Sequence, residues 1–241
     1  QHRELARAAR ARIQDFKSGA PLPEDQDLEL DVDLRSPARV GDIAGPLAGT
    51  ALTDQSVVVV SGLPRSGTSM MMQLLQAGGL PILSDGAREA DEDNPRGYLE
   101  YEAAKKSQDN SWVRDAHGKG VKLVAQLLTN LPAGPDYRIL FMERNLGEVV
   151  ASQGAMLRRQ NATGATLSDR RLAATYRAQI HAAQRMLRRY GERISVLGID
   201  YHEALADPEG TARRVNAFLG GAFDEQAMRR AIDPSLRRQK N

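Results

Sequence analysis

The feature that most constrains the fold is the stretch VVVVSGLPRSGTSMMMQLL, which runs from Val57 to Leu75. Four consecutive valines predict a strand that is buried on both faces, as in a parallel sheet. Two glycines five positions apart, Gly62 and Gly67, then bound a turn, and the apolar residues after Thr68 predict a helix. This order is typical of a phosphate-binding loop, because the N–H groups of the turn and the positive end of the helix dipole converge on one anion.

The loop differs from the usual ATP-binding form in the place of its cation. Where such loops carry a lysine, this chain has Thr68, and a cation stands three residues earlier, at Arg65. A glycine turn without a ligand would not need the buried strand before it or the paired hydroxyls, Thr68 and Ser69, after it. We therefore expect the loop to bind a phosphate-like anion, with Arg65 supplying the charge from within the turn.

Short apolar runs alternate with helical patterns over the rest of the chain. Strands are expected at 57–61, 81–84, 120–125, 137–143 and 193–199. Helices are expected at 68–77, 101–114, 146–159 and 168–190. A last helix is expected to begin at Pro208, with Asp207 as its N-cap. Short apolar strands separated by helices imply a parallel sheet covered on both faces. The expected fold class is α/β, a three-layer P-loop fold in which a central, mainly parallel sheet is flanked by helices.

Two parts of the chain are expected. Residues 1–50 are predicted to form an N-terminal helix, over 3–17, and a linker, SGAPLPEDQD, and residues 51–241 a P-loop domain. From Leu28 to Leu34 apolar and acidic residues alternate, which fits either an exposed strand or an extended segment. The first residue is Gln, which leaves open that a module precedes residues 1–50.

Composition narrows the classes of function. The chain has no cysteine, which excludes disulfides, thiolate zinc sites and a cysteine nucleophile. No apolar run is long enough to span a membrane and no leader is recognisable, so a cytoplasmic protein is expected. The net charge is +2, and the arginine clusters fit solvated helix faces without the aromatic residues of a nucleic-acid site, so no nucleic-acid partner is expected.

Two more motifs follow the loop. ERNLGEVVASQ, residues 143–153, places Arg144 after a predicted strand and Ser152 eight residues later in a helix. LGIDYHEALADPEGTARRVNAFLG, residues 197–220, joins a strand to a Tyr, an Asp-Pro pair and a Phe-Leu-Gly ending. Together with Pro-Arg-Ser-Gly-Thr in the loop, these motifs resemble the sulfotransferases that use 3′-phosphoadenosine 5′-phosphosulfate (PAPS). Cytosolic members carry Lys at the position of Arg65, whereas tyrosylprotein and many bacterial members carry Arg.

This resemblance covers about residues 57–220 and implies an enzyme of the sulfotransferase class. Such an enzyme moves a sulfuryl group from PAPS to a hydroxyl or amine of an acceptor, releases adenosine 3′,5′-bisphosphate and uses no metal. By resemblance, Arg65 would stabilise the leaving phosphate. The 5′-phosphosulfate would be bound by the loop residues Pro64, Arg65, Ser66, Gly67, Thr68 and Ser69. The 3′-phosphate would be bound by Arg144 and Ser152, and Tyr201 would lie near the adenine. Cytosolic members also bind the 3′-phosphate with a glycine-rich segment near the C-terminus, and here Arg238 or its neighbour Arg237 would take the place of that segment.

The chain differs from the cytosolic sulfotransferases in the residue that could act as the general base. Those members place a His beyond the strand that corresponds to GVKLVA, whereas this chain has Lys122 and then Val124. Other branches use a glutamate, and NPRGYLEYE nominates Glu100, with Glu102, Asp85 and Asp91 as reserves. Burial is expected to raise the pKa of such a carboxylate towards the working pH. Lys122 would either contact the sulfuryl group or merely extend from its strand.

The acceptor is expected to be a small molecule, a peptide or a glycan, bound by segments 84–118 and 155–170. Tyr98, Tyr101 and Trp112 fit either an apolar acceptor pocket or the core. Two other functions stay open. In a P-loop kinase that uses ATP and magnesium, Glu143 would organise the metal, although the absence of Gly-Lys-Ser/Thr argues against it. In a catalytically silent nucleotide-binding module, the loop would persist without a base.

Overall fold

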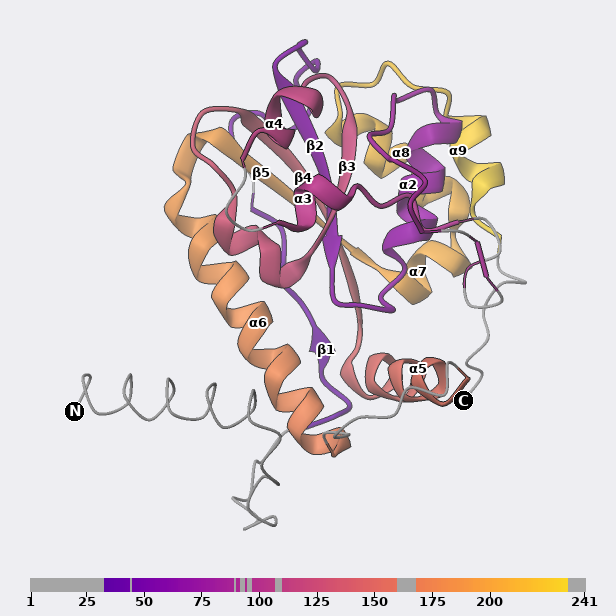
Figure 1. Ribbon diagram of the computed structural model, residues 1–241. Helices are drawn as coiled ribbons and strands as arrows, with labels where there is room; N and C mark the ends of the chain where they lie inside the picture. The colour runs from indigo at the N-terminus through magenta and orange to yellow at the C-terminus, as the bar shows by residue number, and fades with distance from the viewer. Residues whose placement is uncertain are drawn as a thin grey trace, which may run out of the picture. The chain divides into compact units, whose positions relative to one another are not determined.

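The computed structural model describes residues 33–43, 45–88, 90–91, 94, 97–106, 110–159 and 168–233. The predicted helix at 3–17, the linker after it, and Arg237 and Arg238 lie outside these ranges. Figure 1 shows a central sheet with helices on both of its faces. Among the helices of the described ranges, none is long and apolar enough to cross a membrane.

The sheet is mainly parallel and has five strands. Four of them pair in the order β3–β2–β4–β5, all parallel, and the two-residue β1 pairs antiparallel with the end of β4. The strands are β1 Pro37–Ala38, β2 Ser56–Gly62, β3 Gly120–Val124, β4 Asp136–Asn145 and β5 Ile194–Asp200. Every residue of β2 is buried, as the run of valines predicts for a central strand covered on both faces.

Alternating side chains of the strands form two cores. On one face Val57, Val59 and Phe141 pack with α5 (Leu146–Arg159), α6 (Asp169–Arg189) and the 3-10 helix η1 (Ala125–Asn130). On the other face Val58 and Leu140 pack with α2 (Thr68–Ala77), α8 (Pro208–Phe218) and α9 (Glu225–Ala231). The remaining elements are α3 (Glu102–Lys105), α4 (Trp112–Asp115), η2 (Gly191–Arg193) and α7 (Tyr201–Ala206). The predicted three-layer α/β class is confirmed.

Most predicted elements are confirmed, and two are wrong. The helices at 68–77 and 146–159 have the predicted bounds, and the Asp207 side chain accepts the predicted capping hydrogen bond from Gly210 N. The strand expected at 81–84 is a single bridge between Ile82 and Gly120. The helix expected at 101–114 is two short helices, because Lys106 is extended and ends the first one.

The parallel order brings four carboxyl strand ends to one edge of the sheet. The loop after β2 carries Arg65, β3 carries Lys122, the end of β4 carries Arg144, and α7 begins with Tyr201 directly after β5. In open α/β sheets this edge is where ligands bind. The candidate site is therefore sought there.

Candidate active site

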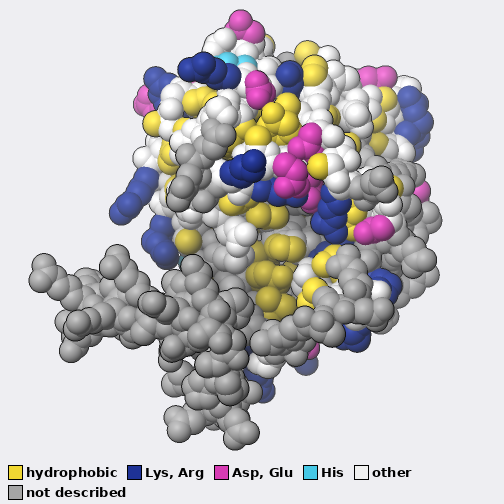
Figure 2. Space-filling model, viewed as in Figure 1, with side chains coloured by type: hydrophobic (Ala, Val, Ile, Leu, Met, Phe, Trp, Pro, Cys, Tyr) yellow, Lys and Arg dark blue, Asp and Glu magenta, His cyan; other side chains and the backbone are white. Residues whose placement is uncertain are grey.

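A cavity of about 500 Å³ lies at this edge of the sheet. Figure 2 shows the corresponding face, on which hydrophobic side chains occupy a depression next to basic and acidic ones. Nine of the residues predicted from the sequence line the cavity: Pro64, Arg65, Gly67, Thr68, Ser69, Lys122, Arg144, Ser152 and Tyr201. Glu100, the predicted base, lines it too. The structure thus brings residues from five separate segments together in one cavity.

Ser66 is the predicted loop residue that the structure does not bring into the cavity. Its side chain is buried, and its hydroxyl donates a hydrogen bond to the carbonyl of Leu63 at 2.7 Å. The backbone N–H of Ser66 also points to the Leu63 carbonyl, at 3.2 Å. Both donors of Ser66 are therefore used inside the loop, where they tighten its turn.

The conformation of the loop turns Arg65 into the cavity. Arg65 has φ +66°, a left-handed conformation that is uncommon for a residue with a side chain. From this position its Nε donates to Ser152 Oγ at 3.2 Å, and its Nη1 lies 3.9 Å from the sulfur of Met156. The cation of the loop and the serine of the second motif, 87 residues apart in the sequence, are therefore in direct contact.

Gly67 is required where the loop meets Tyr201. Gly67 has φ +101°, and a Cβ at this position would lie 2.7 Å from Tyr201 Cδ2. The ring cannot easily withdraw, because the guanidinium of Arg144 covers it, 4.3 Å from the ring centroid.

Gly67→Ala is therefore expected to lower the free energy of unfolding by about 3 kcal/mol, from the backbone strain and the clash together. Gly79→Ala is the matched control, because Gly79 has φ +98° with open space around it, and it should cost only about 1 kcal/mol. Thermal or urea denaturation measures both variants. Equal losses would show that Tyr201 does not restrict the loop.

Arg144 is held from three sides. Its Nη1 donates to the carbonyl of Arg65 at 2.9 Å, its Nε donates to Glu148 Oε2 at 2.9 Å, and its guanidinium stacks on Tyr201. Glu148 in turn lies 2.9 Å from His202 Nε2. The Arg144 side chain is only 6% exposed and lines the cavity. An anion bound there would meet a guanidinium that is already oriented.

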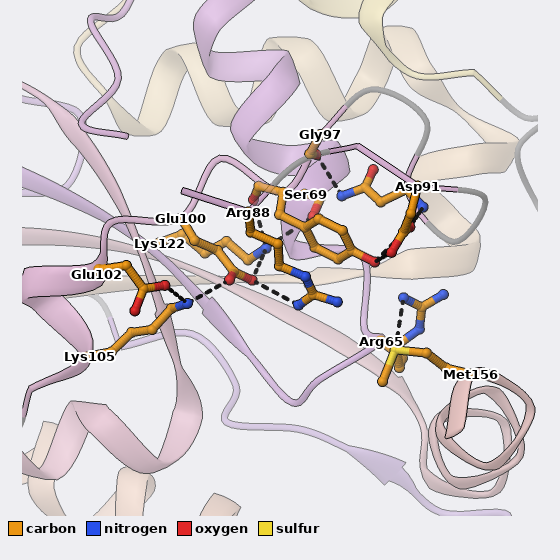
Figure 3. A network of polar contacts seen from close by, with 12 residues as sticks. Arg65, Ser69, Arg88, Asp91, Gly97, Glu100, Glu102, Lys105, Lys122 and Met156 are labelled. Atoms are coloured by element: carbon orange, nitrogen blue, oxygen red, sulfur yellow. Dashed lines mark hydrogen bonds and ion pairs between the residues drawn. The ribbon is translucent and has the colours of Figure 1, made fainter. Parts of the chain in front are cut away.

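Lys122 and Glu100 belong to a second polar network, drawn in Figure 3. Lys122 Nζ donates to Ser69 Oγ at 3.0 Å, to the Tyr98 carbonyl at 2.8 Å and to Glu100 Oε1 at 3.2 Å. Burial, opposed by the charge of Glu100, lowers the pKa of Lys122 to about 8. Lys122 therefore changes its charge near physiological pH, unlike an exposed lysine.

The expected rise in the pKa of Glu100 is wrong. Burial by itself would raise it, but hydrogen bonds and charges from Lys105 and Lys122 outweigh burial and lower the pKa below its ordinary value. Lys105 Nζ lies 2.8 Å from Glu100 Oε2 and Lys122 Nζ 3.2 Å from Oε1. Glu100 is thus a carboxylate held ionised by two lysines. Lys105 did not follow from any sequence motif, although its spacing of five residues from Glu100 was visible.

The reserve carboxylates lie outside the cavity lining. Asp85 accepts hydrogen bonds from the backbone N–H groups of Glu102 and Ala87, which lower its pKa. Asp91 accepts from the hydroxyl of Tyr98 at 2.8 Å, and Glu102 pairs with Lys105. Among the three aromatic residues considered for the acceptor pocket, Tyr98 lines the cavity, whereas Trp112 is part of the core.

Glu143, the acid that a magnesium-dependent kinase would need, is not among the residues that line the cavity. Its Oε1 accepts hydrogen bonds from the N–H groups of Val40 and Gly41, both at 2.9 Å, and its Oε2 lies 3.5 Å from Arg39. Burial raises its pKa. Glu143 therefore ties the segment before β2 to the sheet, which is a structural task.

The comparison with models of protein families agrees with the sequence resemblance. Residues 116–225 match the model of the sulfotransferase family. A comparison with curated proteins gives no match. Among solved structures, the "Sulfotransferase Domain from the Curacin Biosynthetic Pathway" is 16% identical, with a TM-score of 0.44, over 78% of this chain and 90% of that one. The "Sulfotransferase Domain from the Synechococcus PCC 7002 Olefin Synthase" is 14% identical, with a TM-score of 0.43, over 78% and 86%.

Proposed function

We propose that this chain, whose residues 116–225 belong to the sulfotransferase family, transfers a sulfuryl group from PAPS to a hydroxyl or amine of an acceptor. The observation that carries the proposal is the meeting of two cationic groups in one cavity, Arg65 in the loop and Arg144 at the end of β4. PAPS has phosphate on both sides of its ribose, whereas ATP has a single phosphate chain. Two anion-binding groups on neighbouring elements therefore suit PAPS better than ATP.

The donor would lie across the loop. The 5′-phosphosulfate would accept hydrogen bonds from the N–H groups at the start of α2 and from the hydroxyls of Thr68 and Ser69, where the helix dipole favours negative charge. The 3′-phosphate would meet Arg144 and Ser152. Because Arg65 and Ser152 hydrogen-bond each other without a ligand, each would exchange this bond for a phosphate oxygen when the donor binds.

The reaction places different demands on the three charged groups. The acceptor oxygen attacks sulfur while the bond between sulfur and the 5′-phosphate oxygen breaks, and negative charge grows on that oxygen. Arg65 would neutralise this charge, and Lys122 would contact the sulfuryl oxygens. Glu100 would accept the hydrogen bond of the attacking hydroxyl and take its proton. Since the two lysines lower the pKa of Glu100, the proton should move late, when the S–O bond is largely formed.

Turnover is expected to fall as the pH rises through about 8, because Lys122 is an ammonium below its lowered pKa and a neutral amine above it. Lys122→Gln should be about 100-fold slower at neutral pH and should lack this decline, since the titrating group is gone. Initial rates of PAPS consumption between about pH 6 and pH 9 measure both. If the turnover of Lys122→Gln still declined above pH 8, a group other than Lys122 would cause the decline.

Transfer itself can be tested with PAPS labelled in its sulfuryl group, incubated in EDTA with a pool of small hydroxyl and amine compounds. The proposal predicts labelled organic sulfate from the wild-type chain and none from Arg65→Ala. In a parallel reaction, ATP labelled in its γ-phosphate with magnesium should give no labelled organic phosphate. Labelled organic phosphate, or binding of PAPS without any transfer, would contradict the proposal, the first result favouring a kinase and the second a silent module.

A further inference from the structure

Two cations of the cavity have no task in the proposed binding of the donor. Arg88 and Lys105 both line the cavity, and both belong to the part of the chain between Ser84 and Lys106. Figure 3 shows both of them turned towards Glu100, with Arg65 and Met156 to one side. Their side chains are 36% and 39% exposed, so a molecule that enters the cavity can reach them.

The ring of Tyr98 orients Arg88, whose N–H groups do not form a hydrogen bond with Glu100. Its guanidinium carbon lies 3.3 Å from the centroid of the Tyr98 ring. That ring is buried, and its hydroxyl donates to Asp91 at 2.8 Å. The nearest approach of Arg88 to Glu100 is 3.7 Å, from Nη1 to Oε1, which is longer than a hydrogen bond. A stacked guanidinium with donors left on its edge is suited to bind a planar or tetrahedral anion at two points.

The charges around Glu100 are unequal. Lys105 and Lys122 already neutralise this carboxylate at 2.8 Å and 3.2 Å, and Arg88 adds a third cation. Two carboxylates, Glu100 and the half-exposed Glu102 that also pairs with Lys105, stand against these three cations, so positive charge is in excess in a partly buried place, where unpaired charge is costly. The pKa of Lys122, which burial lowers most, is lowered further by Arg88 and Lys105. A bound anion would relieve this repulsion.

Apolar side chains line the same cavity as these cations. Val124 and Leu127, at the end of β3 and in η1, line the same cavity, as does Met156 of α5. A ligand that contacts both the cations and these apolar side chains therefore carries an acidic group on an apolar body. Water or a simple inorganic anion would satisfy only the cations.

We propose that Arg88, with Lys105 beside it, binds an acidic group of the acceptor, so that the acceptor of this enzyme is a hydroxyl compound with a carboxylate or phosphate on an apolar chain or ring. This inference rests on the proposed function, because it takes the molecule opposite the donor to be the acceptor. The acidic group pairs with Arg88, and the apolar body lies along Leu127 and Met156. The hydroxyl then reaches Glu100 and the sulfuryl group between Arg65 and Lys122.

The test uses the full chain saturated with adenosine 3′,5′-bisphosphate, so that the phosphate sites are filled. Calorimetry compares three probes that share one apolar chain: 8-hydroxyoctanoate, 8-hydroxyoctyl phosphate and the neutral 8-hydroxyoctanamide. Both anions should bind about tenfold or more tightly than the amide, and Arg88→Gln should remove this preference while leaving the amide and the bisphosphate unchanged. Whichever anion binds more tightly identifies the acidic group.

The matched control is Arg213→Gln, because Arg213 is an exposed arginine of α8 that pairs with Glu209 outside the cavity. It should leave all affinities as in the wild type. Equal binding of the three probes, including no binding of any, would overturn the inference, as would an Arg88→Gln variant that loses the bisphosphate instead of the anionic probes. If the wild-type chain fails to bind the bisphosphate in the first step, the proposed function itself has failed.

Discussion

Replacing Arg65 with Ala is expected to lower kcat about 1000-fold, the largest loss that we predict for a single side chain in this cavity. A charged donor aimed at a leaving oxygen contributes most when charge develops in the transition state, and losses of this size are typical for such groups. The ground state loses less, because the N–H groups of the loop and Arg144 remain. The affinity for adenosine 3′,5′-bisphosphate should therefore fall by only about tenfold.

Two controls accompany this measurement. Arg65→Lys keeps a cation in the turn, as in the cytosolic sulfotransferases that the loop resembles, and should recover part of the lost rate. Ser152→Ala removes the hydroxyl that Arg65 contacts and should affect the binding of the bisphosphate more than kcat. If kcat of Arg65→Ala stayed within about tenfold of the wild type, the loop cation would not be the group that stabilises the leaving phosphate.

The second large effect concerns Arg144. Arg144→Ala is expected to weaken the binding of adenosine 3′,5′-bisphosphate about 100-fold while changing the affinity for 5′-AMP by less than about threefold, because only the first ligand has a 3′-phosphate. The substitution also leaves Glu148 and the Arg65 carbonyl without this partner, so the free energy of unfolding should fall by about 2–3 kcal/mol. Calorimetry and thermal denaturation measure the two effects separately.

Glu148→Gln separates the orientation of Arg144 from its charge. This variant keeps the Arg144 cation, and the new amide keeps a polar contact with Arg144 and His202. The affinity for the bisphosphate should therefore fall by about tenfold at most. If Arg144→Ala lost affinity for the bisphosphate and for 5′-AMP to the same extent, Arg144 would support the loop structurally and would not bind the 3′-phosphate.

The central part of the fold followed from the sequence because local pattern and burial agree there. The valines of β2, the glycines of the loop and the apolar positions of α2 each indicate one structure, and the order of strands and helices then favours a parallel sheet. The strand expected at 81–84 failed because four residues with a Pro at the start can satisfy the apolar pattern without forming a ladder. Ser, Asp and Asn between 107 and 110 similarly favour a break over a continuous helix from 101 to 114.

The candidate site was predictable where it depends on motifs and not where it depends on contacts between distant segments. Arg65, Arg144 and Ser152 stand in recognisable patterns. Arg88 has no motif, and its place beside Glu100 depends on the path of a loop. The predicted direction of the pKa shift of Glu100 was wrong for the same reason. Burial of Glu100 could be expected from the sequence, but the approach of Lys105 and Lys122 could not.

The most direct measurement of the central claim, that the cavity binds a nucleotide with separate 5′ and 3′ anions and without a metal, is a calorimetric titration with adenosine 3′,5′-bisphosphate and with ATP, each in EDTA and in excess magnesium. We predict that the bisphosphate binds about 100-fold more tightly than ATP and that magnesium changes the affinity for the bisphosphate by less than about twofold. Tighter binding of ATP, or bisphosphate binding that requires magnesium, would contradict this claim.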